Sequence, residues 1–351
     1  MLSFLYLVRD YAGIKPLYYS ILSDNLIFAS EIRAFKAFNN YWEESRDWRV
    51  YFLIFGHIPE PFTVLRDVYM LPKGSFMRFD LRGGTHVIQK FDNISFGNEI
   101  KDVKEAADGV RGIFLKAIKR HLISDAPIGV FLSGGIDSSL IALASSNFER
   151  ENLKTLSVVF NEKEFSEEYY QKIIVDKIGS KHRAYLISER DFIDNIDDIF
   201  SAMDQPTTDG INTYFISGCA KEEGLKAVLS GLGGDELFGG YPSFCRIDKA
   251  WFLRGVNGNL KEDVRFSRSM PKFLLTKAFE STLPRDVVFR EKRGFSFPFQ
   301  IWMRNNVDLL SGFVKDKSRP ALKRIIDDFR NNRLHWSRFW SLVVLSRQCG
   351  F

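Results

Sequence analysis

The chain has 351 residues, of which 45% are hydrophobic and 26% are charged, and this balance predicts a globular chain of about two domains rather than a disordered or collagen-like one. Its net charge of +5 is spread along the chain, and no stripe of aromatic residues alternates with Lys and Arg, so we expect no nucleic-acid partner. No apolar run reaches the ~18 residues that span a bilayer, and the three cysteines show neither a disulfide nor a zinc pattern, so we expect a cytoplasmic protein without membrane contact.

Short strands predominate in the first part of the chain. Apolar or alternating runs are separated there by Gly, Asp-Asn and Arg-Gly-Gly turns, which is typical of strands joined by tight connections. The predicted strands are Leu2–Val8, Leu17–Leu22, Leu26–Ala29, Ser75–Phe79 and Thr85–Lys90. We therefore expect a β-rich region over residues 1–97.

From about residue 98 the pattern changes to strands that alternate with helices. The predicted helices are Asp102–Ile123, Ser138–Ser146, Glu167–Ile178 and His335–Gln348, and the predicted strands are Ile128–Leu132, Leu156–Phe160, His182–Ile187 and Ala227–Leu229. Such alternation calls for a parallel sheet with helices on both faces. The expected fold class is therefore α/β, with a second domain over residues 98–351.

A short segment with the sequence Ser-Gly-Gly-Ile-Asp-Ser-Ser, Ser133–Ser139, lies between a predicted strand and a predicted helix. Its glycines allow the backbone to approach a phosphate, its hydroxyls can donate to phosphate oxygens, and the helix start supplies N–H groups and a positive dipole. Asp137 would repel a bare phosphate, so its expected role is to hold the Mg²⁺ that accompanies a nucleotide. The alternative is a Gly-Gly turn with a serine cap, which does not require this spacing.

A second glycine-rich segment, Leu229–Tyr241, follows another buried strand and holds five glycines. In open α/β folds, loops at the carboxyl ends of the strands bind ligands. The adjacent acids Asp235 and Glu236 offer oxygen ligands for Mg²⁺. By itself such a loop is equally consistent with a structural turn, and the pairing with the first segment favours a binding site.

The first segment lacks the Gly-Lys-Ser/Thr of a Walker loop and resembles the pyrophosphate loop of the ATP pyrophosphatases, which cleave ATP to AMP and pyrophosphate. Together with further motifs in the same order, both segments resemble the glutamine-hydrolysing asparagine synthetases over nearly the whole chain. These motifs are Arg9–Tyr19, Phe28–Glu31, Asp204–Pro206 and Arg290–Pro298. The resemblance implies an ATP-pyrophosphatase (adenine nucleotide α-hydrolase-like) synthetase domain, preceded by a partial glutaminase-like (Ntn) β region.

The resemblance also implies roles for individual residues. Those expected to bind ATP are Leu132, Ser133, Gly134, Gly135, Asp137, Ser138, Ser139, Val158, Ser230 and Gly231. Val158 is expected at the adenine, and Asp137 and Asp235 are expected to hold Mg²⁺. Lys292 is expected to hold the phosphates of ATP and pyrophosphate, and it joins Asp235 and Glu236 as the expected catalytic residues.

The chain departs from the family at its start. Family members begin with a nucleophilic cysteine, whereas residue 2 here is Leu2. Residues 1–97 are therefore expected to be a remnant of the glutaminase, with an open sheet edge that must be paired or covered. We expect glutamine to be used only with an upstream or separate glutaminase, and whether Met1 is the biological start is left open.

Two further departures concern the synthetase half. Leu232 stands where better-known members have an acid that can act as general base, and Asp235 and Glu236 are the nearest alternatives. Only 26 residues, Cys245–Met270, stand where the family has a long segment that helps form the amino-acid site. Recognition of aspartate is therefore less firmly implied than binding of ATP.

The expected activity is that of a carbon–nitrogen ligase of the asparagine synthase type. A carboxylate, with aspartate as the leading candidate, would form an acyl-adenylate from ATP, and ammonia would then displace AMP. Two alternatives stay open: amidation of another acid, such as a sugar acid or a natural-product precursor, and a degenerate ATP-binding paralogue or fragment without turnover. A separate glutaminase subunit or a second copy of the chain is the macromolecular partner to consider.

Overall fold

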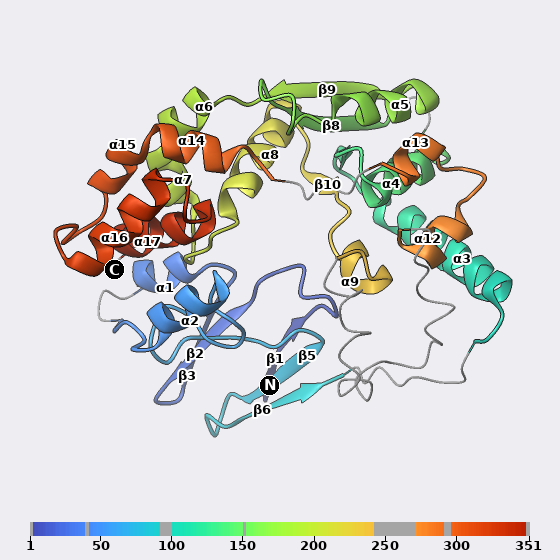
Figure 1. The fold of residues 1–351 in the computed structure, drawn as a ribbon. Coiled ribbons are helices and arrows are strands. Elements are labelled where there is room, and N and C mark those ends of the chain that lie inside the picture. Colours follow the sequence, from blue (N-terminus) through green and yellow to red (C-terminus); the bar gives the residue numbers. More distant parts are fainter. Residues whose placement is uncertain are drawn as a thin grey trace. The chain divides into compact units, whose positions relative to one another are not determined.

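The computed structural model describes residues 3–38, 42–91, 100–149, 152–241, 271–290 and 296–348. The chain forms two compact units (Figure 1). Unit 1 consists of Met1–Ser95, Phe192–Tyr214 and Phe299–Phe351, and unit 2 consists of Phe96–Asp191 and Phe215–Pro298. The units reflect packing alone, so the predicted domain boundary between residues 97 and 98 stays a prediction. None of the helices in the described ranges is long and apolar enough to cross a membrane.

Unit 2 is built on a four-stranded sheet in which every pair of neighbours is parallel. The strand order is β10-β7-β8-β9, with β7 at Ile128–Phe131, β8 at Lys154–Val159, β9 at Lys181–Leu186 and β10 at Ala227–Leu229. This sheet confirms the predicted α/β fold class. Since β10 and β7 are neighbours, the segments that leave their carboxyl ends emerge at the same edge of the sheet.

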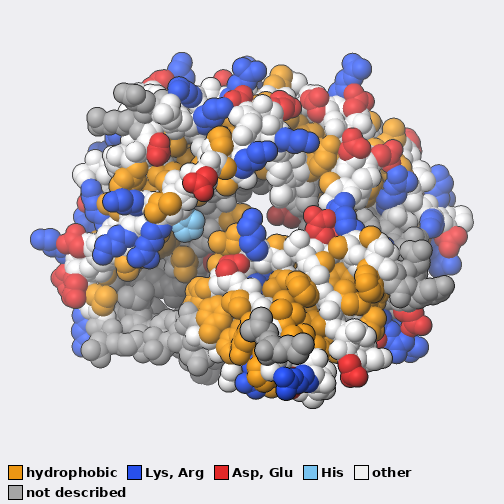
Figure 2. Space-filling model, turned by 180° about the vertical axis from the view of Figure 1, so that it is seen from behind, with side chains coloured by type: hydrophobic (Ala, Val, Ile, Leu, Met, Phe, Trp, Pro, Cys, Tyr) orange, Lys and Arg blue, Asp and Glu red, His pale blue; other side chains and the backbone are white. Residues whose placement is uncertain are grey.

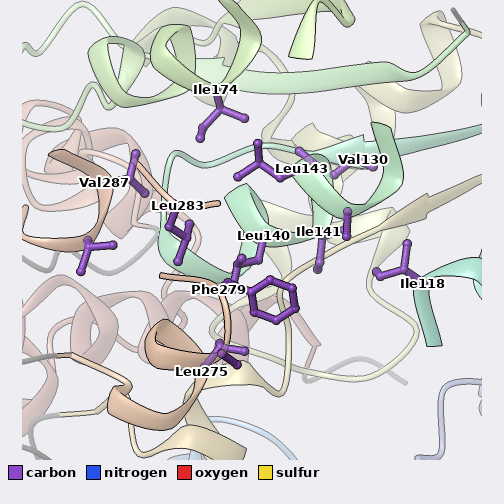
Figure 3. Close-up of a cluster of buried hydrophobic side chains, with 14 of the residues drawn as sticks. Ile118, Val130, Leu140, Ile141, Leu143, Ile174, Leu275, Phe279, Leu283 and Val287 are labelled. Carbon is purple, nitrogen blue, oxygen red and sulfur yellow. The ribbon is translucent and has the colours of Figure 1, made fainter. Parts of the chain in front are cut away.

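Helices cover both faces of this sheet. They are α3 (Val103–His121), α4 (Ile136–Ser146), α5 (Glu168–Ile178), α8 (Gly210–Glu222), α9 (Gly234–Phe238), α12 (Phe273–Ala278) and α13 (Arg285–Val288), with the short α6 (Glu189–Asp194) after β9. On one face, Val130 of β7 packs with Leu140 of α4 and Ile174 of α5 (Figure 3). On the other face, Leu156 packs with Ala220 of α8. The prediction of helices on both faces is confirmed.

Local sequence sets the ends of several of these helices. The carboxylate of Asp102 accepts a hydrogen bond of 2.7 Å from the Glu105 N–H and so caps α3. Gly179 ends α5, as predicted, with a φ of +66° that suits glycine. Helix α4 begins at Ile136, two residues earlier than predicted, directly after the glycines of the loop.

The first part of unit 1 holds two antiparallel sheets. One has the order β1-β5-β6 and the other has the order β3-β2-β4. The strands are β1 (Phe4–Arg9), β2 (Tyr18–Leu22), β3 (Asn25–Ala29), β4 (Tyr69–Met70), β5 (Ser75–Asp80) and β6 (His86–Lys90). All five strands predicted in this region are present, with ends shifted by one or two residues, and β4 is additional.

Strand β1 lies at the edge of its sheet within the described residues, as the expectation of an open edge requires. Its outward side chains Phe4, Tyr6 and Val8 are 41%, 54% and 60% exposed, whereas Leu7 is buried. Figure 2 shows one face of the molecule, on which hydrophobic side chains gather near the bottom of the view.

Unit 1 also contains helices that the sequence did not reveal. Helices α1 (Ile32–Phe38) and α2 (Trp48–Phe55) lie within the region expected to be β-rich. Trp48 and Phe52 of α2 are fully buried, at helical spacing. The aromatic and β-branched run of α2 is equally typical of a strand, so burial in the fold decides between the two.

The two later segments of unit 1, Phe192–Tyr214 and Phe299–Phe351, are helical. Their helices are α7 (Ile196–Ala202), α14 (Phe299–Asn305), α15 (Val307–Gly312), α16 (Pro320–Arg330) and α17 (Trp336–Gln348). Stacked rings fill their core, such as Phe200 on Trp340 at 5.2 Å and Phe329 on Phe339 at 4.3 Å between centroids. The predicted helix His335–Gln348 is thereby confirmed as α17.

The Asp204–Pro206 motif ties these segments of unit 1 together. Asp204 accepts hydrogen bonds from the N–H groups of Ile32 (2.7 Å) and Arg33 (3.0 Å) and so caps the start of α1. The Gln205 amide donates to the Tyr18 hydroxyl at 3.1 Å. In this structure the motif therefore joins parts of the chain that are distant in sequence.

Candidate functional site

The loop after β7 is pressed closely against α5. Gly134 has a φ of +75°, and a Cβ placed on it would lie 2.9 Å from Tyr170 Cβ and 3.2 Å from the Gln171 backbone nitrogen. A side chain at this position is therefore excluded both by backbone conformation and by space. These contacts with α5 therefore fix the conformation of the loop directly before the first turn of α4.

The serines of this loop bond to one another at the start of α4. The Ser133 N–H donates to Ser138 Oγ at 3.2 Å, and the two hydroxyl oxygens are 2.9 Å apart. Ser138 Oγ donates to the Gly135 carbonyl at 3.2 Å. These hydroxyls are held beside first-turn N–H groups that have no acceptor within their own helix, which is the arrangement expected of an anion site.

Five of the predicted nucleotide residues are buried, namely Leu132, Gly134, Ser138, Ser139 and Val158. Leu132 is 1% exposed, and its carbonyl accepts a bond of 2.5 Å from Ser157 Oγ. Val158 is 4% exposed, and its carbonyl accepts from the Gln171 side chain. Ser139 is fully buried, and its hydroxyl makes no hydrogen bond within the described part of the chain. Contact of the Ser139 hydroxyl with a phosphate stays a prediction that this burial does not support.

The two glycine-rich segments meet at Asp137. A Cβ on Gly231 would lie 2.8 Å from Asp137 Cβ, and one on Gly234 would lie 2.6 Å from Asp137 Cγ. Ser230, just before them, follows β10 and is partly exposed. The structure thus brings together the two loops that the sequence analysis paired.

A lysine that the sequence analysis missed stands between the predicted metal ligands. Lys272 Nζ contacts Asp137 Oδ2 and lies 2.7 Å from Asp235 Oδ1. The lysine side chain is only 5% exposed, and its backbone adopts a left-handed φ of +47° directly before α12. The feature of the sequence that could have indicated Lys272 is its position directly before the apolar run Phe273–Leu275.

The donor set at this point fits a cation. Two carboxylates converge on one positive group, and carboxylate oxygens are the ligands that Mg²⁺ prefers. Among the described residues there is no cluster of three or more His, Cys, Asp or Glu side chains that could hold a metal ion. A magnesium ion here would therefore need further oxygens, as from phosphates and water, to complete its shell.

The remaining predicted catalytic residues differ in their surroundings. Glu236 is exposed and accepts a 2.7 Å hydrogen bond from the Tyr241 hydroxyl, and this bond is the main reason that the pKa of Tyr241 rises to about 12. Leu232, at the position of the family's general base, is 92% exposed. Lys292 lies outside the described residues.

Family models match most of the chain. The model described as asparagine synthase matches residues 109–262 and 253–343, and the model described as a glutamine amidotransferase domain matches residues 3–91. The second match covers the antiparallel sheets of unit 1. The first covers both loops and the parallel sheet.

Individual relatives agree with these models. The chain is 32% identical over 287 residues to a putative glutamine-hydrolysing asparagine synthetase 2 of Methanocaldococcus jannaschii, covering 80% of this chain and 52% of the relative. It is 35% identical over 244 residues to the glutamine-hydrolysing asparagine synthetase 1 of Bacillus subtilis, covering 68% and 37%. Amidase chry2 of Gibberella zeae is 28% identical over 261 residues, covering 67% and 38%.

The chain thus spans about half the length, or less, of the curated relatives that it matches. Its match to the asparagine synthase model nevertheless extends over well more than half of its own residues and includes every predicted site position. The resemblance inferred from the motifs is confirmed: the chain belongs to the asparagine synthase family.

Proposed function

We propose that this chain is a carbon–nitrogen ligase that amidates a carboxylate at the expense of ATP, with aspartate as substrate and asparagine as product. The observation that carries the proposal is the meeting of the two loops at Asp137, beside the start of α4. Membership of the asparagine synthase family supports the use of ATP.

In the proposed first step a substrate carboxylate oxygen attacks the α-phosphorus of ATP. The new oxygen–phosphorus bond forms as the bond to the β-phosphate oxygen breaks, giving an acyl-adenylate and pyrophosphate. Negative charge grows on the leaving pyrophosphate, and preorganised donors lower the cost of that charge. The N–H groups of the first turn of α4 are the donors that we assign to the phosphates, and the hydroxyls of Ser133 and Ser138, which bond within the loop in the free chain, would turn toward the phosphates when ATP binds.

Asp137 and Asp235 are the residues that would hold Mg²⁺, which neutralises phosphate charge when bound. Lys272, paired with both carboxylates, limits the repulsion between them in the free chain. Lys292 is proposed as a further cation for the leaving pyrophosphate.

In the second step ammonia attacks the acyl carbon, and AMP departs as the nitrogen loses a proton. Leu232 cannot accept that proton. Asp235 is held by Lys272, so Glu236, one residue further along α9, is the acceptor that we favour. We expect Glu236→Gln to slow amide formation while leaving the release of pyrophosphate in the first step nearly unchanged.

The products of ATP cleavage test the proposal. Labelled ATP is incubated with the 351-residue chain, aspartate and ammonium, and the nucleotides are separated. AMP and pyrophosphate in equal amounts with asparagine are expected, and ADP with phosphate would contradict the mechanism. Lys292→Ala should reduce turnover far more than ATP binding.

The nitrogen donor gives a second test. The only thiols of these 351 residues are Cys219, Cys245 and Cys349, and none lies within residues 3–91, which the glutamine amidotransferase model matches. We expect ammonium to support amidation and glutamine to fail unless a separate glutaminase chain is added. Replacing the three cysteines with alanine should leave this preference unchanged, and glutamate release from glutamine by the purified chain would contradict it.

A second candidate is amidation of a different acid. The likeness to a Gibberella zeae protein named as an amidase and the short Cys245–Met270 segment favour it. A panel of carboxylic acids, scored by acid-dependent pyrophosphate release, separates the two candidates. If no acid in the panel causes pyrophosphate release although ATP binds tightly, the result would instead indicate a degenerate ATP-binding chain.

A further inference from the structure

Helix α5 contacts both the phosphate-type loop and the segment that contains Thr282 and Arg290. Its first turn supports the loop, because Gly134 lies against Tyr170 and Gln171. Toward its other end, Lys177 Nζ donates to the Thr282 carbonyl at 2.8 Å. The loop thus lies at the start of α5, and Thr282 is bonded near its end.

Arg290 is the residue of that segment whose side chain could bind an anionic ligand. Its Nη1 lies 2.7 Å from Glu167 Oε1, and the two side chains are 8% and 11% exposed. Its guanidinium carbon lies 5.1 Å from the centre of the Tyr170 ring. A rigid ion pair and an aromatic surface thus fix the plane of the guanidinium.

The other amino group of Arg290 faces the loop. Nη2 lies 3.6 Å from the position that a Cβ on Gly135 would occupy, and Gly135 is the residue that precedes the first turn of α4. The start of a helix carries positive potential, and the Arg290 guanidinium adds positive charge on the same side of the loop, so an anion placed between them would be attracted by both.

We propose that Arg290 is a phosphate-binding residue of this loop, and that Glu167 is the positioning residue that orients it. The proposal rests on the proposed function, since it assigns a further contact to the phosphate chain of the same nucleotide. The Nη1 group of the guanidinium binds Glu167, and the Nη2 group donates to phosphate oxygens at the start of α4. Nothing in the loop sequence itself points to this residue.

Calorimetric titration of the 351-residue chain tests the proposal with three probes: MgATP, magnesium pyrophosphate and adenosine. Arg290→Gln should weaken MgATP and pyrophosphate by about tenfold or more and leave adenosine within about twofold, because a charged hydrogen bond to phosphate is lost. Glu167→Gln keeps the guanidinium and should weaken both phosphate probes less. Arg285→Gln, an exposed arginine of the same segment, is the matched control and should bind like the parent.

Several results would overturn the proposal. One is an equal affinity for pyrophosphate in Arg290→Gln and in the parent. Another is an equal loss of affinity in the Arg290 and Glu167 variants for all three probes, adenosine included, because such a loss indicates a purely structural ion pair. If Arg290→Gln does not fold, the double variant Glu167→Gln/Arg290→Gln, which removes both buried charges, replaces it and should still lose pyrophosphate binding. A parent chain that binds no MgATP would overturn the proposed function itself.

Discussion

The parallel sheet of unit 2 and the β1-β5-β6 sheet of unit 1 bury their side chains in different ways. In β8 four consecutive residues, Thr155–Val158, are buried, because helices cover both faces of the sheet. In β1 the burial alternates, with Leu7 and Arg9 buried and their neighbours exposed. The parallel sheet is therefore covered by helices on both faces, whereas β1 exposes apolar side chains on one face of its sheet.

This difference coincides with the position of the predicted site. Every described residue of the predicted site belongs to unit 2, at the carboxyl end of β7 and β10 or close to it. A sheet packed on both faces holds the two loops in fixed register, which close contacts such as Gly231 against Asp137 require. The antiparallel sheets carry none of these residues.

The largest expected effect contrasts the two sheets directly. Leu156→Ala, at 1% exposure, should lower the free energy of unfolding by about 2–5 kcal/mol, whereas Val8→Ala, at 60% exposure, should cost under about 0.5 kcal/mol. Urea unfolding of both variants measures the difference. Similar losses would show that the outer face of β1 is as closely packed as the core of unit 2.

The buried lysine of the site gives the next effect. Lys272→Met leaves Asp137 and Asp235 close together without their shared cation, so we expect a loss of about 3 kcal/mol in unfolding free energy. Addition of Mg²⁺ should restore part of this loss. The control Lys277→Met removes an exposed ion pair with Glu280 and should change stability by less than about 1 kcal/mol. A Lys272 variant as stable as the parent, with no response to Mg²⁺, would contradict this description of the site.

The contact between the loops predicts a smaller loss. Gly231→Ala forces a methyl group against Asp137 Cβ and the Ser138 backbone nitrogen, so overpacking should cost about 1–3 kcal/mol and weaken ATP binding. Gly112→Ala places the same methyl group in open space on α3 and should stabilise the chain by about 0.5–1 kcal/mol. If both alanines affect ATP binding equally, the loops do not depend on close contact.

The smallest effect concerns Cys219. Burial raises the pKa of this thiol from 9.0 to about 12, so it stays protonated at pH 8 and should react with iodoacetamide only slowly until the chain is unfolded. Because the folded pKa lies above the unfolded one, its contribution to stability is complete below about pH 9 and is lost as the pH rises toward 12. Rapid labelling of the folded chain at pH 8 would contradict its burial.

Much of the fold and of the site followed from local sequence. Strands β7 to β10 and the loop after β7 were predictable because apolar runs, glycines and serines define them within a few residues. The role of Lys272 was not predictable, since it depends on a carboxylate 135 positions away in the sequence. The role proposed for Arg290 likewise depends on its contact with Glu167, which is distant in sequence. Helix α2 was missed because its apolar run has no pattern that separates a buried helix from a strand.

The central claim is that the loop after β7 binds MgATP through Asp137, and calorimetry of three chains tests it most directly. The parent is titrated beside Asp137→Ala and beside Asp125→Ala, which removes an exposed carboxylate just before the opposite end of β7. We predict that Asp137→Ala loses about 2 kcal/mol or more of binding free energy and that Asp125→Ala binds like the parent. Equal MgATP affinity in all three chains would contradict the claim.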